Sequence, residues 1–232
     1  MHGWDRFTPI DETLRALDDL VAAGKARYLG FSDTPAWKVA QAQVTAHFRG
    51  WAPLIALQIE YSLLERTVEG ELIPMAQELG LGVTPWSPLR YGVLSGKYSR
   101  AQRTVQSKRG EWITAALTDH ALNVLDVLLK VAEELGTTPA RVALAWLQSR
   151  PSVVSTIIGA RTVAQLEDNL GALEVSLSPE HIAALEEISR PVPAFPMSYL
   201  PAFESFARGG STLNGESFEL QALLPTSDQQ RY

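Results

Sequence analysis

The sequence contains no cysteine among its 232 residues. This absence excludes disulfide bonds, thiolate metal sites and catalysis by a thiol. Basic residues are also in the minority, because 20 lysines and arginines stand against 26 aspartates and glutamates, for a formal net charge of −6. The chain therefore has no broad basic surface for nucleic acid or an anionic membrane, and an anionic ligand must be bound by local lysines and arginines.

Long apolar runs are missing as well. No run reaches the roughly 18–20 residues that span a bilayer. The first residues, MHGWDRFTP, have neither the basic region nor the apolar core of a signal peptide. We therefore expect no membrane partner and a cytoplasmic location. The hydrophobic content of 46% and the charged content of 20% are typical of a globular chain, with room for one large α/β domain or two small ones.

The apolar pattern repeats along the first half of the chain. Segments typical of strands begin near residues 26, 54 and 82, at equal intervals of 28 residues, and a helical pattern follows each of the first two. This interval is the length of one strand-helix unit, which predicts parallel strands with helical crossovers. A fourth strand is predicted over residues 153–159, and residues 99–118 are predicted to be mostly irregular. Further helices are predicted over residues 119–135, 140–149 and 163–173 and from residue 178.

The stretch VTPWSPLRYGVLSGKY, residues 83–98, combines a strand end with a polar loop. Trp86 stands at the carboxyl end of the strand, and the loop that follows contains Ser87 and Lys97. Ligands of parallel α/β sheets bind beyond the carboxyl ends of the strands. An aromatic face, a hydroxyl and a lysine suit a flat ring joined to phosphate. A buried tryptophan beside an ordinary proline turn is the alternative interpretation of these residues alone.

Together with IIGARTVAQLEDNLGAL at residues 157–173, this stretch resembles the cofactor-binding half of the aldo-keto reductases. Further matching segments are HGWD, IDETLRALDDLVAAGKARYLGFSD, LQIEYSLLER, TPARVALAWL and LSPE. The resemblance implies an α/β fold, a partial TIM (β/α)8 barrel that is N-terminally truncated, with about four parallel strands and flanking helices over residues 1–190. Residues 191–232 are expected to form a tail packed on the barrel or on a partner chain.

The resemblance also implies NADP(H) as cofactor and a small-molecule aldehyde or ketone as substrate. Ser32, Asp33 and Gln58 match groups that hydrogen-bond the nicotinamide carboxamide, although Asp33 replaces the usual asparagine and cannot donate when ionised. Trp86 matches the aromatic residue that stacks on the nicotinamide. In the loop, Ser87, Pro88 and Leu89 match residues along the diphosphate, and Lys97 matches its cationic partner.

The adenosine end is assigned in the same way. Gly159 and Arg161 match the turn that binds the 2′-phosphate, between a strand end and a helix start. Gln165 and Asn169 match adenine or ribose contacts, and Asp168 stands in the same set where many family members have glutamate. Taken singly, each of these residues also reads as a surface polar residue on a helix.

The catalytic residues of the family are mostly unmatched. In the family a tyrosine acts as general acid, tuned by a lysine and an aspartate, and a histidine places the carbonyl. Only the histidine has a counterpart here, His2, and Tyr91 is the candidate substitute acid. Three interpretations follow: a weak NADPH-dependent carbonyl reductase, a non-catalytic dinucleotide-binding or assembly subunit, or a relic with neither function. The residues do not identify the carbonyl substrate.

Half a barrel would leave strand edges unpaired, unless residues near Met1 pair locally. We expect side chains such as Leu57 and Val83 to face the barrel interior and to lose the opposite wall. Because a long unpaired apolar edge promotes aggregation, we predict a homo-oligomer, in the simplest case a dimer, that covers this edge and buries on the order of 1,000–2,000 Å².

Overall fold

The computed structural model describes residues 1–98, 100 and 110–219. The chain divides into two compact units, Met1–Pro191 and Val192–Tyr232. In the described residues, no helix is both long enough and apolar enough to cross a bilayer.

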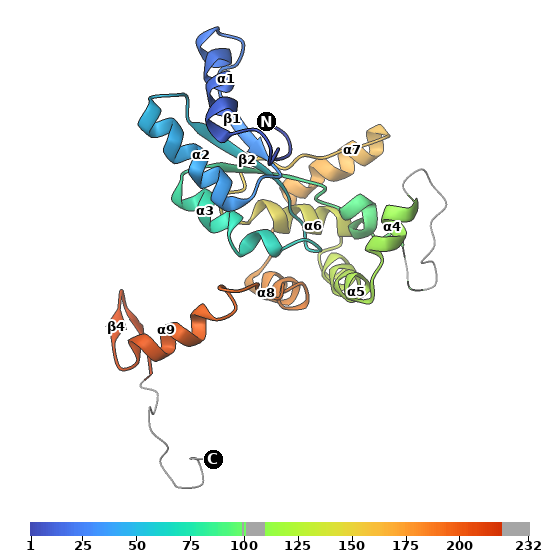
Figure 1. Ribbon diagram of the computed structural model, residues 1–232. Helices are drawn as coiled ribbons and strands as arrows, with labels where there is room; N and C mark the ends of the chain where they lie inside the picture. Colours follow the sequence, from blue (N-terminus) through green and yellow to red (C-terminus); the bar gives the residue numbers. More distant parts are fainter. Residues whose placement is uncertain (99, 101–109, 220–232) are drawn as a thin grey trace. The chain divides into compact units, whose positions relative to one another are not determined.

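A parallel sheet of three strands, in the order β1-β2-β3, organises the first unit (Figure 1). The helix α1 precedes β1, and the helices α2 and α3 form the two crossovers, as the 28-residue interval predicts. The bounds are α1 (Ile10–Ala22), β1 (Leu29–Ser32), α2 (Ala36–Arg49), β2 (Leu54–Glu60), η1 (Thr67–Glu69), α3 (Leu72–Glu78), β3 (Gly82–Trp86) and η2 (Arg90–Ser95).

Both outer strands of the sheet have a short parallel neighbour. Next to β1, the backbone N–H of Ser32 donates to Met1 O at 2.9 Å, the N–H of Gly3 donates to Ser32 O at 3.0 Å, and His2 is bridged to Ser32. The chain start therefore pairs locally with β1, so that β1 is not a bare edge.

At the other edge, the predicted fourth strand is present only as one bridge, between Val83 and Val153. The N–H of Val83 donates to Ser152 O at 2.7 Å, and the N–H of Val154 donates to Val83 O at 3.0 Å. The next donor of β3 would be residue 85, but Pro85 has no N–H, so the ladder lacks that bond. The N–H of Ile157 still donates to Pro85 O at 2.9 Å, so residues 153–159 follow β3 without forming a full strand.

The register of the sheet separates a buried face from an open face. Phe31, Leu57 and Val83 are aligned partners and are buried at 1%, 0% and 0% exposure against the helices. The expectation that Leu57 and Val83 face the barrel interior is therefore wrong. Because side chains alternate along a strand, the opposite face carries the alternate residues. These are Gly30, Ala56 and Gly82, then Ser32, Gln58 and Thr84, and then Glu60 and Trp86.

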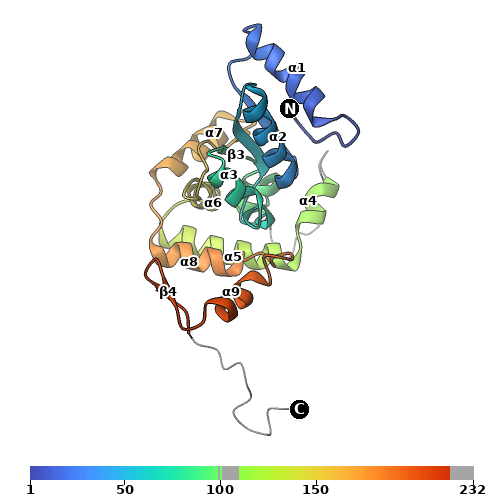
Figure 2. The same ribbon diagram turned by 60° about the vertical axis from the view of Figure 1, so that its left-hand side comes forward.

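The remaining helices of the first unit complete its core. Helices α5, α6 and α8 begin at hydroxyl N-caps: the side chains of Thr118, Thr138 and Ser178 accept hydrogen bonds from backbone N–H groups of the first turn. Figure 2 shows α5 and α8 side by side, in agreement with their packing. The bounds are α4 (Gly110–Ala116), α5 (Asp119–Glu134), α6 (Pro139–Gln148), α7 (Val163–Leu170), η3 (Gly171–Glu174) and α8 (Pro179–Ile188).

Helix α4 lies inside the segment predicted to be irregular. Its Ile113 is buried together with Val93, Tyr98, Leu117 and Leu122 in a small second cluster. The prediction therefore missed this seven-residue helix, while residues 99 and 101–109 lie outside the described residues.

The second unit contains α9 (Leu200–Arg208) and a hairpin of β4 (Thr212–Leu213) and β5 (Glu216–Ser217). Asn214 and Gly215 join the two strands with φ of 52° and 85°, the left-handed conformations that a two-residue hairpin turn requires. Asn-Gly is a preferred pair in two-residue hairpin turns, so this turn could have been predicted from the sequence. The predicted packing of this segment on the barrel or on a partner stays a prediction, as does the homo-oligomer.

Candidate functional site

The carboxyl ends of the three strands bring predicted site residues into one row. Ser32 is the aligned partner of Gln58, and Gln58 is the aligned partner of Thr84, so the three side chains share the open face. Ser32 is only 4% exposed, and its Oγ has no hydrogen-bond partner among the described residues. A buried unpaired hydroxyl costs about 1–3 kcal/mol, so this row contains a polar group that a ligand could satisfy.

Trp86 stands in the next row, aligned with Glu60. Its indole N–H donates to Oδ1 of Asp33 at 2.9 Å, and the backbone N–H of Asp33 donates to Gln58 O at 3.1 Å. The resemblance implied a carboxamide contact for Asp33. In the structure its carboxylate fixes the orientation of the Trp86 ring, a role that the sequence did not reveal.

The loop after β3 contains the remaining residues predicted at the diphosphate. Pro88 is buried, Ser87 and Leu89 are half-buried, and Lys97 is exposed. A Cβ added to Gly92 would lie 2.8 Å from Nζ of Lys97. Because Gly92 has φ of 90° and no side chain, the Lys97 ammonium can fold back over the loop. The loop thus presents a cation above its own backbone.

The turn before α7 is open to solvent. Gly159, Arg161 and Gln165 are all exposed. The hydroxyl of Thr162 caps the helix by accepting from the N–H of Gln165 at 3.2 Å, and Oε1 of Gln165 accepts from the N–H of Arg161 at 2.9 Å. Arg161 therefore immediately precedes a capped helix start, where the positive end of the helix dipole and a positively charged residue both favour an anion.

Asp168 and Asn169 lie further along α7 in a different environment. Asn169 is 8% exposed. Asp168 accepts from the Thr138 hydroxyl at 3.1 Å and forms an ion pair with Nε of Arg141 at 2.8 Å. Arg141 packs over Gly171, where an added Cβ would lie 2.4 Å from Cζ. The structure thus shows Asp168 joining α7 to α6, and its contact with a nucleotide stays a prediction.

Replacement of Asp168 by asparagine separates these two roles. The pair with Arg141 is 32% exposed on both sides, so we expect a loss of only about 0.5–1 kcal/mol in the free energy of unfolding, measured by urea denaturation. Asp126→Asn is the matched control, because its pair with Arg100 is more exposed, at 58% and 48%. Unchanged stability combined with weaker nucleotide binding would instead favour the ligand role.

The candidate catalytic residues do not form one group. His2 is exposed and pairs with β1 through its backbone. Tyr61 is buried and donates to Glu69 Oε1 at 2.7 Å, and burial together with this bond raises the pKa of its phenol far above 10. The ring of Tyr91 packs against Trp112 of α4, with centroids 5.8 Å apart.

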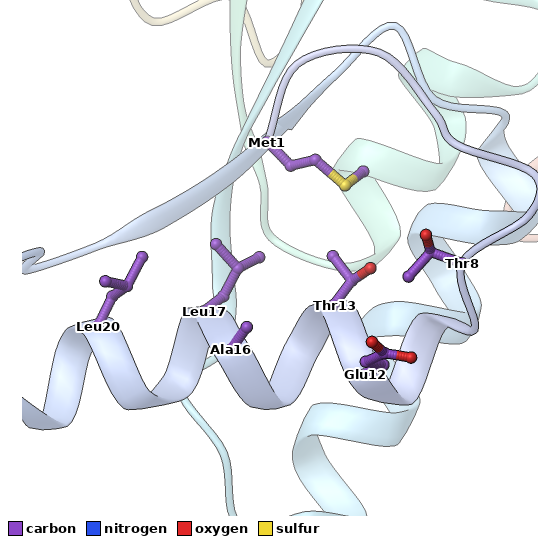
Figure 3. A pocket seen from close by; sticks show the side chains of 7 residues that line it. All are labelled: Met1, Thr8, Glu12, Thr13, Ala16, Leu17 and Leu20. Atoms are coloured by element: carbon purple, nitrogen blue, oxygen red, sulfur yellow. The ribbon is translucent and has the colours of Figure 1, made fainter.

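A separate pocket of about 380 Å³ lies between the chain start and α1 (Figure 3). Figure 3 shows the Met1 side chain over Thr13 and Leu17. None of the predicted cofactor residues lines this pocket, so it is distinct from the strand-end site. Its lining residues are Met1, Thr8, Glu12, Thr13, Ala16, Leu17 and Leu20.

Comparison with known proteins gives consistent results. Residues 1–190 match the model of the aldo/keto reductase family. The chain is 42% identical to the uncharacterized oxidoreductase YrpG of Bacillus subtilis over 81% of this chain and 56% of that protein. It is 35% identical to the putative aryl-alcohol dehydrogenase AAD10 of Saccharomyces cerevisiae, over 86% of this chain and 70% of that protein.

A relative of another kind is also similar. A probable voltage-gated potassium channel subunit beta of Oryza sativa is 35% identical over 85% of this chain and 63% of that protein. The chain thus spans between about half and about two thirds of the length of these relatives. With the family model covering residues 1–190, the chain belongs to the aldo/keto reductase family.

Proposed function

We propose that this chain binds NADP(H) across the carboxyl ends of β1–β3 and the turn before α7, and that it reduces an aldehyde or ketone there by hydride transfer. The observation that carries the proposal is the strand-end row. It combines the buried, unpaired hydroxyl of Ser32 and the amide of Gln58 with the neighbouring ring of Trp86 on one face of the sheet.

These residues fit the nicotinamide end of the cofactor. An amide ligand needs both a donor and an acceptor, and the Ser32 hydroxyl and the Gln58 amide each provide both. Trp86 would hold the flat ring by stacking, with its own orientation fixed by the bond to Asp33. When bound, the reduced cofactor supplies the hydride. Stacking on one side of the ring leaves the other side for the carbonyl substrate.

The other groups fit the phosphates. The Lys97 ammonium over the loop would meet the diphosphate, and the exposed Arg161 with Gly159 would meet the 2′-phosphate at the start of α7. In a chain of net charge −6, such local cations are needed to hold an anionic nucleotide.

Proton donation is the weak part of the site. His2, beside Ser32, would place the carbonyl oxygen. Among the tyrosines described above, Tyr61 is bound to Glu69 and Tyr91 packs on Trp112. Loss of a general acid lowers a rate by about 10²–10⁴-fold, so we propose slow turnover by this chain.

The other contacts made by Tyr61 and Tyr91, which leave the site without an evident proton donor, also favour a second function. This function is that of a non-catalytic dinucleotide-binding or assembly subunit. One relative is named as a channel subunit, which supports this reading without identifying a partner for this chain. Steady-state oxidation of NADPH with a panel of aldehydes and ketones separates the two. Carbonyl-dependent oxidation above the protein-free rate supports the reductase, and binding of NADPH without turnover supports the subunit.

Replacement of Arg161 by alanine tests the nucleotide assignment. We expect NADPH affinity to fall by about 10- to 100-fold, because a charge-assisted contact to the phosphate is lost. NADH lacks this phosphate and should change little. Calorimetric titrations with NADPH and with NADH measure the change in affinity for each nucleotide. Arg190→Ala is the control, because Arg190 is another exposed arginine. An equal loss for both nucleotides would contradict the assignment.

A further inference from the structure

The loop after β3 has an unfavourable backbone. Ser87, Arg90 and Tyr91 have φ of 54°, 43° and 56°, in the left-handed region that residues with a Cβ rarely adopt. Such a conformation persists only where surrounding contacts hold it, and clusters of this kind occur at ligand clamps. The contacts that hold this loop are therefore informative about its role.

One end of the loop is anchored in the core. Val93 and Leu94 are both 0% exposed and belong to two different clusters of buried residues. Within the loop, the N–H groups of Gly92 and Leu94 donate to Leu89 O at 2.9 and 3.2 Å. These contacts anchor the second half of the loop in the core, and Leu94 shares its cluster with residues of the sheet.

The other end is tied to the sheet by an ion pair. Arg90 Nη1 donates to Oε1 of Glu60, and the same nitrogen lies 3.9 Å from Oε2 of Glu65. Arg90 and Glu60 are 24% and 20% exposed, so the pair is largely shielded from water. Because Glu60 is aligned with Trp86, this one contact connects the loop to the row that holds the aromatic ring.

We propose that Arg90 and Glu60 are positioning residues that hold the loop of residues 87–97 in its nucleotide-accepting conformation before the nucleotide binds. This inference rests on the proposed function, since it assigns the loop to the diphosphate. The pair attaches the loop that contains Lys97 to the strand residue aligned with Trp86, and a dinucleotide must contact both the Trp86 ring and the Lys97 ammonium. Preorganisation of this kind raises affinity by reducing the cost of ordering the loop.

The charges around Glu60 make the pair sensitive to pH. Burial raises the pKa of Glu60 from its ordinary value of 4.5, the Arg90 guanidinium opposes this shift, and the carboxylates of Glu65 and Asp33 add to it. The Arg90 guanidinium holds the pKa of Glu60 below the value that the same buried carboxyl would have without it. Protonation of Glu60 therefore removes the attraction to Arg90, and the attachment of the loop is expected to weaken as pH falls through the pKa of Glu60.

Two variants test the positioning role in the full chain. Arg90→Ala removes the cation, and Glu60→Gln keeps the size of the side chain but removes its charge. In both we expect faster amide hydrogen exchange over residues 89–94 in the nucleotide-free protein. We also expect about tenfold weaker binding of NADP⁺, as if the competent conformation fell to a tenth of the population. Arg15→Ala is the control, because its pair with Asp19 on α1 is exposed at 61% and 60%, and it should change neither quantity.

The pH dependence adds a signature that a purely structural role would not give. NADP⁺ is used as the probe because NADPH decomposes in acid. Wild-type affinity should fall as pH is lowered through the pKa of Glu60, whereas Glu60→Gln should show only the titration of the 2′-phosphate that both proteins share. Arg90→Lys, which keeps a cation, should recover part of the lost affinity.

The outcomes separate this inference from the proposed function. Unchanged exchange over residues 89–94 in Glu60→Gln overturns the positioning role whether or not nucleotide binds. Unchanged NADP⁺ affinity in both variants, in a wild-type protein that binds NADP⁺, overturns it while leaving the proposed function intact. A wild-type protein without saturable binding overturns both.

Discussion

Replacement of Trp86 by alanine is expected to weaken NADPH binding by about 10- to 100-fold. Stacking of a flat base on an aromatic side chain is worth about 1–3 kcal/mol by alanine substitution, and each 1.4 kcal/mol is about a factor of ten in the dissociation constant. Trp86 is the aromatic residue next to the row of Ser32, Gln58 and Thr84, and its ring is already oriented by Asp33. Isothermal titration calorimetry measures the change without relying on tryptophan fluorescence.

The matched control for this prediction is Trp51→Ala. Trp51 is half-buried and precedes β2, so it lies at the amino end of the sheet, opposite to the candidate site. Trp86→Phe keeps a flat ring and should retain much of the affinity. Equal affinities in wild type and Trp86→Ala would show that the nicotinamide does not rest on this ring.

Replacement of Trp146 by alanine is expected to lower the free energy of unfolding by about 3–5 kcal/mol, the range measured for large aromatic side chains in cores. Trp146 on α6 is 0% exposed. Its ring meets Tyr61 edge-on with centroids 5.9 Å apart, and the Cζ atoms of Arg66 and Arg150 lie 5.2 and 5.0 Å from its centroid. Urea denaturation followed by circular dichroism gives the change.

The expected loss of stability in Trp146→Ala also includes contacts of Arg66 and Arg150, because these two arginines pack on the indole ring and connect other elements. Arg66 donates to Glu69, to the backbone of Glu186 and to the Ser189 hydroxyl, which joins the segment after β2 to α8. Trp112→Ala is the control, since Trp112 is 61% exposed and should change stability by less than about 0.5 kcal/mol. A loss below about 1 kcal/mol in Trp146→Ala would show that α6 does not support the core.

Part of the fold could be predicted from the sequence because local signals were strong. The equal spacing of apolar segments placed β1, β2 and β3, and the hydroxyl residues before α5, α6 and α8 marked their starts. The family implies a (β/α)8 barrel, and the parallel sheet with its flanking helices is consistent with part of one. The faces of β2 were assigned wrongly because its sequence, LIALQIE, has apolar residues at both odd and even positions. The alternation of apolar and polar residues therefore did not show that Leu57 points toward the helices.

Trp86 was placed at a strand end from the apolar pattern, whereas Ser32 and Gln58 were assigned only through the family resemblance. The structure aligns Ser32 with Gln58 and Glu60 with Trp86, because parallel strands bring their carboxyl ends to one edge, and the nucleotide contacts of these residues stay a prediction. The bonds from Trp86 to Asp33 and from Arg90 to Glu60 join residues 53 and 30 positions apart, and no local pattern encodes them. The ion pair of Asp168 with Arg141, 27 positions away, could not be predicted because a contact between distant residues leaves no local sequence pattern.

A crystal structure of this chain with NADPH is the decisive test of cofactor binding at the carboxyl ends of β1–β3. We expect the carboxamide within hydrogen-bonding distance of Ser32 and Gln58, the nicotinamide stacked on Trp86, and the 2′-phosphate at Arg161. Nucleotide bound elsewhere, for example in the pocket between Met1 and α1, or nicotinamide turned away from Trp86, would contradict it.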